Sequence, residues 1–106
     1  MKVSELKSAQ LDYWVGKAEG LKPRIGLNGE CYTFDGKYFP STNWAQGGPI
    51  IEKEKIISVP PGNYFSEWVA IKKKNRGKGS TPLIAAMRCY VASKYGGEVK
   101  EKPCST

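Results

Sequence analysis

The stretch STPLIAAMRCYVASKYG, residues 80–96, carries the signals of one complete helix. Ser80 or Thr81 can act as its N-cap, and Pro82 suits the first helical position. Gly96 can take the left-handed conformation that ends a helix. The side chains that fall on one stripe at helical spacing are Leu83, Ala86, Met87, Tyr90, Val91 and the stem of Lys94. We therefore predict a core-facing helix from Pro82 to Tyr95.

A basic segment, KKKNRGKG at residues 72–79, leads directly into this helix. It contains no acidic residue, and its cations are Lys72, Lys73, Lys74, Arg76 and Lys78. We predict a flexible loop that places positive charge beside a helix N-terminus, which itself favours anions. The Walker phosphate-binding pattern is absent, because Gly79 follows Lys78 directly. The alternative interpretation is a mobile, solvated loop without a ligand.

Further elements are predicted on the N-terminal side of the basic segment. Apolar residues recur at helical spacing from Ala9 to Glu19. The region from Ile25 to Phe39 is rich in strand formers and contains two hairpin turn signals, Asn28-Gly29 and Asp35-Gly36. Strands are also predicted at 56–59 and 64–72, and a short helix from Pro49 to Glu54.

The expected architecture is a single small α+β domain spanning residues 1–106. An antiparallel sheet formed by the Ile25–Phe39 and Ile56–Lys72 regions should be covered on one face by two helices, Ala9–Glu19 and Pro82–Tyr95. A chain of 106 residues is long enough for one modest core. The tail after about residue 99 has no pattern, and we expect it to be flexible.

The composition excludes several kinds of site. The chain has no histidine, which removes Ser-His and Cys-His nucleophiles and every zinc site that needs imidazole. Cys31, Cys89 and Cys104 are not spaced like a thiolate zinc site, and they fit a reducing compartment. No apolar run approaches the length of a membrane span, and the N-terminus lacks a signal-peptide core. We therefore expect a cytoplasmic protein that is not an enzyme, with no catalytic residue, metal, cofactor or membrane partner.

The segment Asn43-Trp44-Ala45-Gln46-Gly47-Gly48-Pro49 is the best candidate for a recognition surface. Trp44 offers a flat stacking face, while Asn43 and Gln46 offer paired donors and acceptors. The glycines Gly47 and Gly48 would let a ligand reach the backbone amides. The alternative is a tight structural turn with Trp44 in the core.

Arg88 stands in the middle of the C-terminal helix among apolar neighbours. Such an arginine often extends its head group to solvent or pairs with a carboxylate. The functional alternative is an arginine that binds an anion. We expect Arg88 to converge with Asn43, Trp44 and Gln46 on one pocket for a small, base-containing anion.

Two long motifs, TNWAQGGPIIE at residues 42–52 and TPLIAAMRCYVASK at residues 81–94, resemble known signature segments. The family they resemble is the NinX-like family of small proteins, encoded by tailed phages and prophages of enteric bacteria. The segment KAEG at residues 17–20, which ends the N-terminal helix, is also similar, so the resemblance spans most of the chain. It implies a phage accessory protein that acts in the bacterial host cytoplasm. It implies no chemistry and no catalytic residue, since the family has no assigned function.

Three functions fit these expectations. The first is a non-enzymatic protein that binds a small anionic, nucleotide-like ligand. A phage protein of this kind can sequester a nucleotide signal that the host uses in defence. The second, ranked lower, is a nucleic-acid-binding accessory of phage replication or recombination that uses the cations of residues 72–78. The third is an inhibitor that docks on a host protein, or a protein that pairs with itself as a homodimer.

Overall fold

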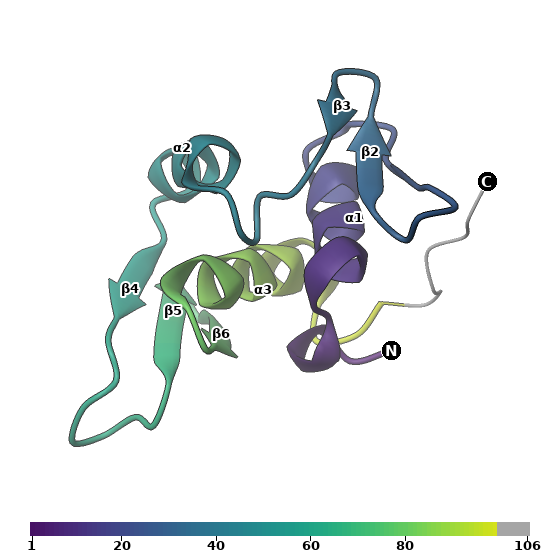
Figure 1. Cartoon of the computed structure of the whole chain (residues 1–106). Helices are drawn as coiled ribbons and strands as arrows, with labels where there is room; N and C mark the ends of the chain where they lie inside the picture. Colours follow the sequence, from purple (N-terminus) through teal and green to yellow (C-terminus); the bar gives the residue numbers. More distant parts are fainter. Residues whose placement is uncertain (100–106) are drawn as a thin grey trace.

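The computed structural model describes residues 1–99, which fold around one central helix (Figure 1). The elements in chain order are η1 (Val3–Glu5), α1 (Ser8–Ala18), β1 (Arg24–Ile25), β2 (Cys31–Thr33), β3 (Gly36–Lys37), α2 (Trp44–Glu54), β4 (Ile57–Val59), β5 (Trp68–Lys72), β6 (Asn75–Gly79) and α3 (Pro82–Tyr95). The predicted α+β class is confirmed. The predictions for the tail after residue 99 and for Cys104 lie outside the described residues.

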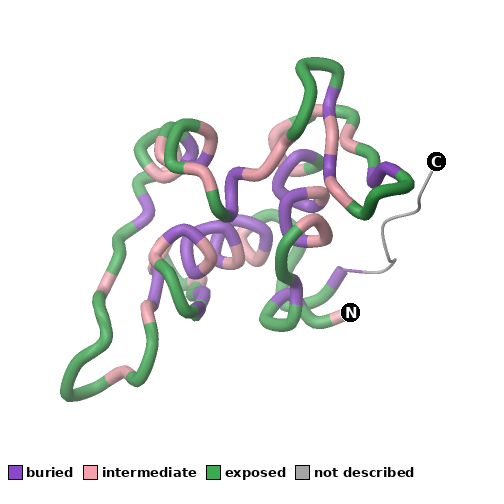
Figure 2. The backbone as a smooth tube through the Cα atoms, viewed as in Figure 1, coloured by how far each residue is buried: buried purple, intermediate pink, exposed green. Residues whose placement is uncertain are grey.

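Helix α3 is the centre of the core and has the bounds that the sequence predicts. The Thr81 hydroxyl oxygen caps it by accepting a hydrogen bond from the Ile84 N–H at 3.1 Å. Gly96 follows its last turn with a φ of 83°. Half of its residues are buried, because α1, α2 and the strands β4–β6 all pack on it (Figure 2).

The strands form two sheets rather than the single sheet predicted. The sheet β1-β2-β3 lies beside α1, and the sheet β4-β5-β6 lies beside α3; both are antiparallel. The prediction of one sheet was wrong because α2 separates the two groups of strands, and β1–β3 are too short for an extended ladder. The turn between β2 and β3 is Phe34-Asp35, one residue earlier than predicted, since Thr33 pairs with Gly36.

The basic segment is a β-hairpin, so the prediction of a flexible loop was wrong. Strands β5 and β6 pair over their full length up to Lys72 and Asn75, which leaves Lys73 and Lys74 as the turn. Lys73 has a φ of 55° there, a conformation that the lysine itself does not favour. The strand is hard to recognise in the sequence because β6 has glycine where a strand normally shows apolar side chains.

Those glycines let the backbone of β6 lie directly on α3. A Cβ on Gly77 would overlap the carbonyl oxygen of Ala85, and one on Gly79 would also meet the helix. The close approach therefore requires glycine at both positions. Because side chains alternate along a strand, Arg76 and Lys78 lie on the face of the sheet that points away from α3.

The glycine-rich segment before Pro49, for which a tight turn was the structural alternative, is the first half of α2. The Asn43 side-chain oxygen caps the helix by accepting a hydrogen bond from the Ala45 N–H at 2.8 Å. Pro49 lies inside the helix instead of at its start. Gly47 packs so closely on the Pro40 carbonyl that no Cβ fits. Tertiary packing thus outweighs the low helix propensity of glycine and proline.

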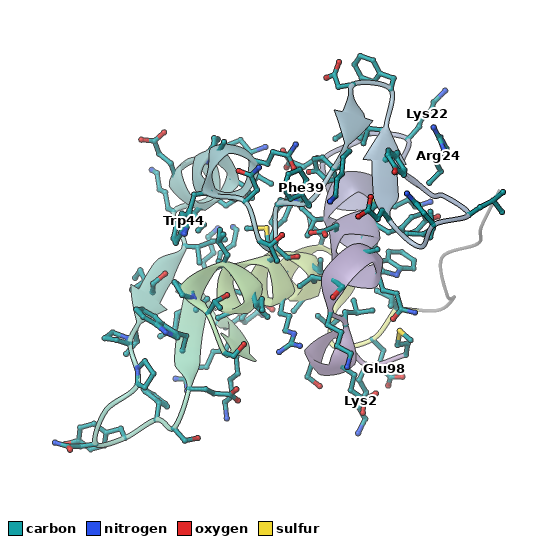
Figure 3. All side chains as sticks on the ribbon, viewed as in Figure 1. Lys2, Lys22, Arg24, Phe39, Trp44 and Glu98 are labelled. Carbon is teal, nitrogen blue, oxygen red and sulfur yellow. The ribbon has the colours of Figure 1, made fainter. Side chains whose placement is uncertain are left out.

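The two ends of the described chain form an antiparallel pair. Met1 and Val99 exchange two backbone hydrogen bonds of 2.8 Å, and Lys2 lies opposite Glu98 (Figure 3). We call residues 1–3 together with 97–99 the terminal clip. The clip is anchored because Val3 and Val99 are both buried in the core.

Candidate anion-binding pocket

The terminal clip, strand β6 and helix α3 enclose a pocket of about 540 Å³, which we call the clip pocket. This volume lies within the range of small-molecule sites in proteins. The N-terminal segment and the clip form one wall, β6 forms the other, and α3 contributes side chains from its middle. The lining residues are Lys2, Val3, Ser4, Arg76, Gly77, Lys78, Arg88, Ala92, Gly97 and Glu98.

Arg88 is the fixed cation of the clip pocket. Its Nε donates to the Leu6 carbonyl oxygen at 2.9 Å, and its Nη1 donates to the Lys78 carbonyl oxygen at 2.7 Å. The guanidinium therefore bridges the two walls through backbone groups rather than pairing with a carboxylate. A guanidinium has five N–H donors, so three remain for a ligand. Burial lowers the pKa of Arg88, which means that an anion placed here would stabilise its charge.

The remaining charges of the clip pocket come from its rim. Lys2, Arg76 and Lys78 are exposed residues of the rim, and Glu98 is the one acidic residue of the lining. The side chains of Arg76 and Lys78 leave β6 on the face away from α3, so they flank the opening of the pocket, whereas Arg88 lies inside it. Val3 and Ala92 supply apolar surface between them. This combination suits a ligand with a phosphate for the cations and a hydroxyl or amino donor for the carboxylate.

The structure does not bring Asn43 and Gln46 to Arg88. The Asn43 side-chain oxygen is the cap of α2. The Gln46 amide accepts from the Phe39 N–H at 2.6 Å and donates to the Lys37 carbonyl oxygen at 3.1 Å. Gln46 lines a different pocket, of about 340 Å³, so its polar groups hold the chain before α2 in place rather than facing Arg88.

Trp44 is 57% exposed and therefore offers a stacking face, but it does not line the clip pocket. Figure 3 places it on α2, well away from Lys2 and Glu98. Its ring lies along the helix over Gly48. Gly47 is buried against the neighbouring main chain, so its backbone is not open to a ligand as the sequence suggested.

The five cations of the basic segment divide between two places. Arg76 and Lys78 line the clip pocket. At the other end of the hairpin, a second pocket of about 440 Å³ is lined by Lys53, Glu54, Lys55, Lys72 and Lys73, which we call the hairpin-end cluster. The Lys72 ammonium lies 3.6 Å from the Glu54 carboxylate. Lys74 is exposed in the turn beside this cluster.

Buried titratable groups lie outside the clip pocket. Burial raises the pKa of Cys31 to about 12 and that of Cys89 to about 11, so both remain protonated thiols near neutral pH. Asp12 on α1 accepts the Ser41 N–H at 2.8 Å, and burial raises the pKa of its carboxyl to about 6.

Two kinds of functional feature are absent from residues 1–99. No three His, Cys, Asp or Glu side chains gather there in a way that could hold a metal ion. No helix in that range is long and apolar enough to span a membrane.

A family model described as bacteriophage P22 NinX matches residues 2–94. The chain belongs to this family. The resemblance to NinX-like proteins inferred from two sequence motifs is thereby confirmed. The matched range contains all four cations of the clip pocket, while Gly97 and Glu98 follow it. No curated protein matches the chain.

Sequence reasoning named three of the four cations of this pocket but placed them in two different sites. It assigned Arg88 to a small-molecule site and Arg76 and Lys78 to a nucleic-acid surface. It missed Lys2 and Glu98, because the clip pairs residues almost a whole chain apart and no local pattern reveals such pairing. The alternating glycines of β6 were the available signal, since glycine in a strand indicates a close approach of another backbone.

Proposed function

We propose that this NinX-family protein is a non-enzymatic phage accessory protein that binds a nucleotide-like anion in the clip pocket. The observation that carries the proposal is the bridged Arg88, held between two walls that also supply Lys2, Arg76 and Lys78. A preorganised guanidinium loses little freedom when it binds an anion, and it can contact phosphate through two parallel N–H groups.

Glu98 favours a nucleotide over inorganic phosphate as the ligand. A carboxylate beside a phosphate site repels a bare anion but accepts hydrogen bonds from ribose hydroxyls or base amino groups. Two sources can supply a phosphate together with ribose hydroxyls and a base. One is a free nucleotide, such as a host-defence signal that a phage would sequester, and the other is a nucleotide unit of a nucleic acid.

Calorimetry with mono-, di- and cyclic nucleotides tests this proposal. Charge-assisted hydrogen bonds contribute about 1.5–3 kcal/mol, so Arg76→Gln and Lys78→Gln should each weaken binding about tenfold or more. Lys17→Gln and Lys22→Gln remove exposed lysines that do not line the pocket, and they serve as matched controls. Absence of binding to every nucleotide at millimolar concentration would contradict the proposal, and so would equal losses in the control variants.

A further inference from the structure

The positive charge of this protein is concentrated in its second half. Residues 44–99 contain nine lysine and arginine residues against four acidic ones, whereas residues 1–43 contain six against five. The β5–β6 hairpin is the densest part of this charge. It connects the clip pocket at one end to the hairpin-end cluster at the other.

The distance along the hairpin exceeds the size of one nucleotide. Strand β6 runs three residues from Asn75, where it leaves the turn, to Lys78 at the pocket, and an extended strand rises about 3.3 Å per residue, or roughly 10 Å over this part. The Lys73–Lys74 turn lies beyond it. Exposed cations occur along this whole length at Lys73, Lys74, Arg76 and Lys78. A ligand with a single phosphate group can neutralise only the cations at one end.

An exposed aromatic ring accompanies the cations. Tyr64 is 93% exposed on the β4–β5 loop, which projects from the body of the molecule (Figure 2). Tyr64 and Lys78 line the same small hollow of about 110 Å³. Tyr64 therefore lies beside the pocket end of the exposed cations on the hairpin. Aromatic rings interleaved with cations are the features by which proteins hold unpaired bases and their backbone phosphates.

We propose that the ligand of the clip pocket is a single-stranded oligonucleotide whose backbone continues along the β5–β6 hairpin, with one base stacked on Tyr64. This assignment rests on the proposed function, because the clip pocket receives one nucleotide unit of the strand. Lys73 and Lys74 contact phosphates beyond the pocket. Recognition is independent of sequence, since backbone contacts carry no base information.

The test is fluorescence anisotropy with a labelled 12-nucleotide strand, its duplex and a competing mononucleotide. The strand should bind at least tenfold more tightly than either the mononucleotide or the duplex. For about four neutralised phosphates, the logarithm of the affinity should fall with the logarithm of salt concentration with a slope of about −3. The double variant Lys73→Gln/Lys74→Gln should make this slope shallower by about 1.4. Tyr64→Ala should weaken strand binding about fivefold or more.

The matched control is Lys17→Gln/Lys22→Gln, which removes the same charge from the other half of the chain. It should change the affinity for the strand less than either Lys73→Gln/Lys74→Gln or Tyr64→Ala does. If strand and mononucleotide bind equally and the turn variant has no effect, the oligonucleotide assignment is overturned while the nucleotide pocket stands. Tighter binding of the duplex overturns the single-strand assignment. If neither nucleotide nor strand binds, the proposed function fails as well.

Discussion

Replacing the buried carboxyl of Asp12 by an amide should stabilise the protein at neutral pH. Asp12 is only 3% exposed, and burial raises its pKa from 3.8 to about 6 although its Oδ1 accepts the Ser41 N–H. One pKa unit corresponds to about 1.4 kcal/mol, so ionising this carboxyl in the folded state costs about 3 kcal/mol. Asp12→Asn keeps an oxygen for the Ser41 N–H and removes the charge.

The sign of the pH dependence follows from the raised pKa. Between pH 4 and 6 the folded protein holds a proton on Asp12 that the unfolded chain releases, so this carboxyl makes folding less favourable as the pH rises through that window. Above pH 6 the penalty is constant. The difference in unfolding free energy between Asp12→Asn and the native chain should therefore grow from near zero at pH 4 to as much as about 3 kcal/mol at pH 7.

Urea unfolding followed by tryptophan fluorescence at a series of pH values measures this difference. Asp35→Asn, at an exposed position in the β2–β3 turn, is the matched control and should show no such growth. The reasoning is refuted if Asp12→Asn is less stable than the native chain at pH 7, or if its advantage shrinks as the pH rises from 4 to 6.

Three further substitutions test the packing described above. Gly77→Ala should destabilise the protein by about 3 kcal/mol or more, because β6 cannot approach α3 with a Cβ in place. Gly62→Ala, at an open position, should leave the stability unchanged, and thermal unfolding of the two variants measures the difference. Thr81→Ala should cost about 1 kcal/mol by removing the cap of α3, with Thr81→Ser restoring most of it in urea titrations. Gln46→Ala should lower stability by about 1–3 kcal/mol yet leave nucleotide affinity unchanged in calorimetry, because its amide bonds the backbone outside the clip pocket.

Helix α3 was predictable, because local sequence signals mark both of its ends. The bounds of α3 followed from Thr81, Pro82 and Gly96, each of which acts through its own backbone conformation or side chain. By contrast, β6 was not predictable from local pattern, because its inward positions are glycines and its turn is formed by two lysines. There the close packing of Gly77 on α3 decides the structure, and that contact depends on the tertiary fold.

The candidate site was predictable only in its chemistry. Arg88 stood out as a cation among apolar neighbours in the middle of the helix, and the structure shows that it donates hydrogen bonds to two backbone carbonyl oxygens. Which residues join it depends on the pairing of residues 1–3 with 97–99, which local sequence does not encode. Gln46 and Asn43 drew attention because amides suit ligands, but the same donors and acceptors serve the backbone near α2.

The central claim, that the clip pocket receives the phosphate of a nucleotide, is tested most directly by titrating the ¹⁵N-labelled protein with a nucleotide and mapping the amide shifts. We expect the largest shifts at residues 2–4, 76–78, 88 and 97–98, with the arginine side-chain N–H of Arg88 among them. Arg76→Gln should reduce the shifts at these positions together. Shifts that instead gather around Trp44 on α2, or no shifts at millimolar nucleotide, would contradict the claim.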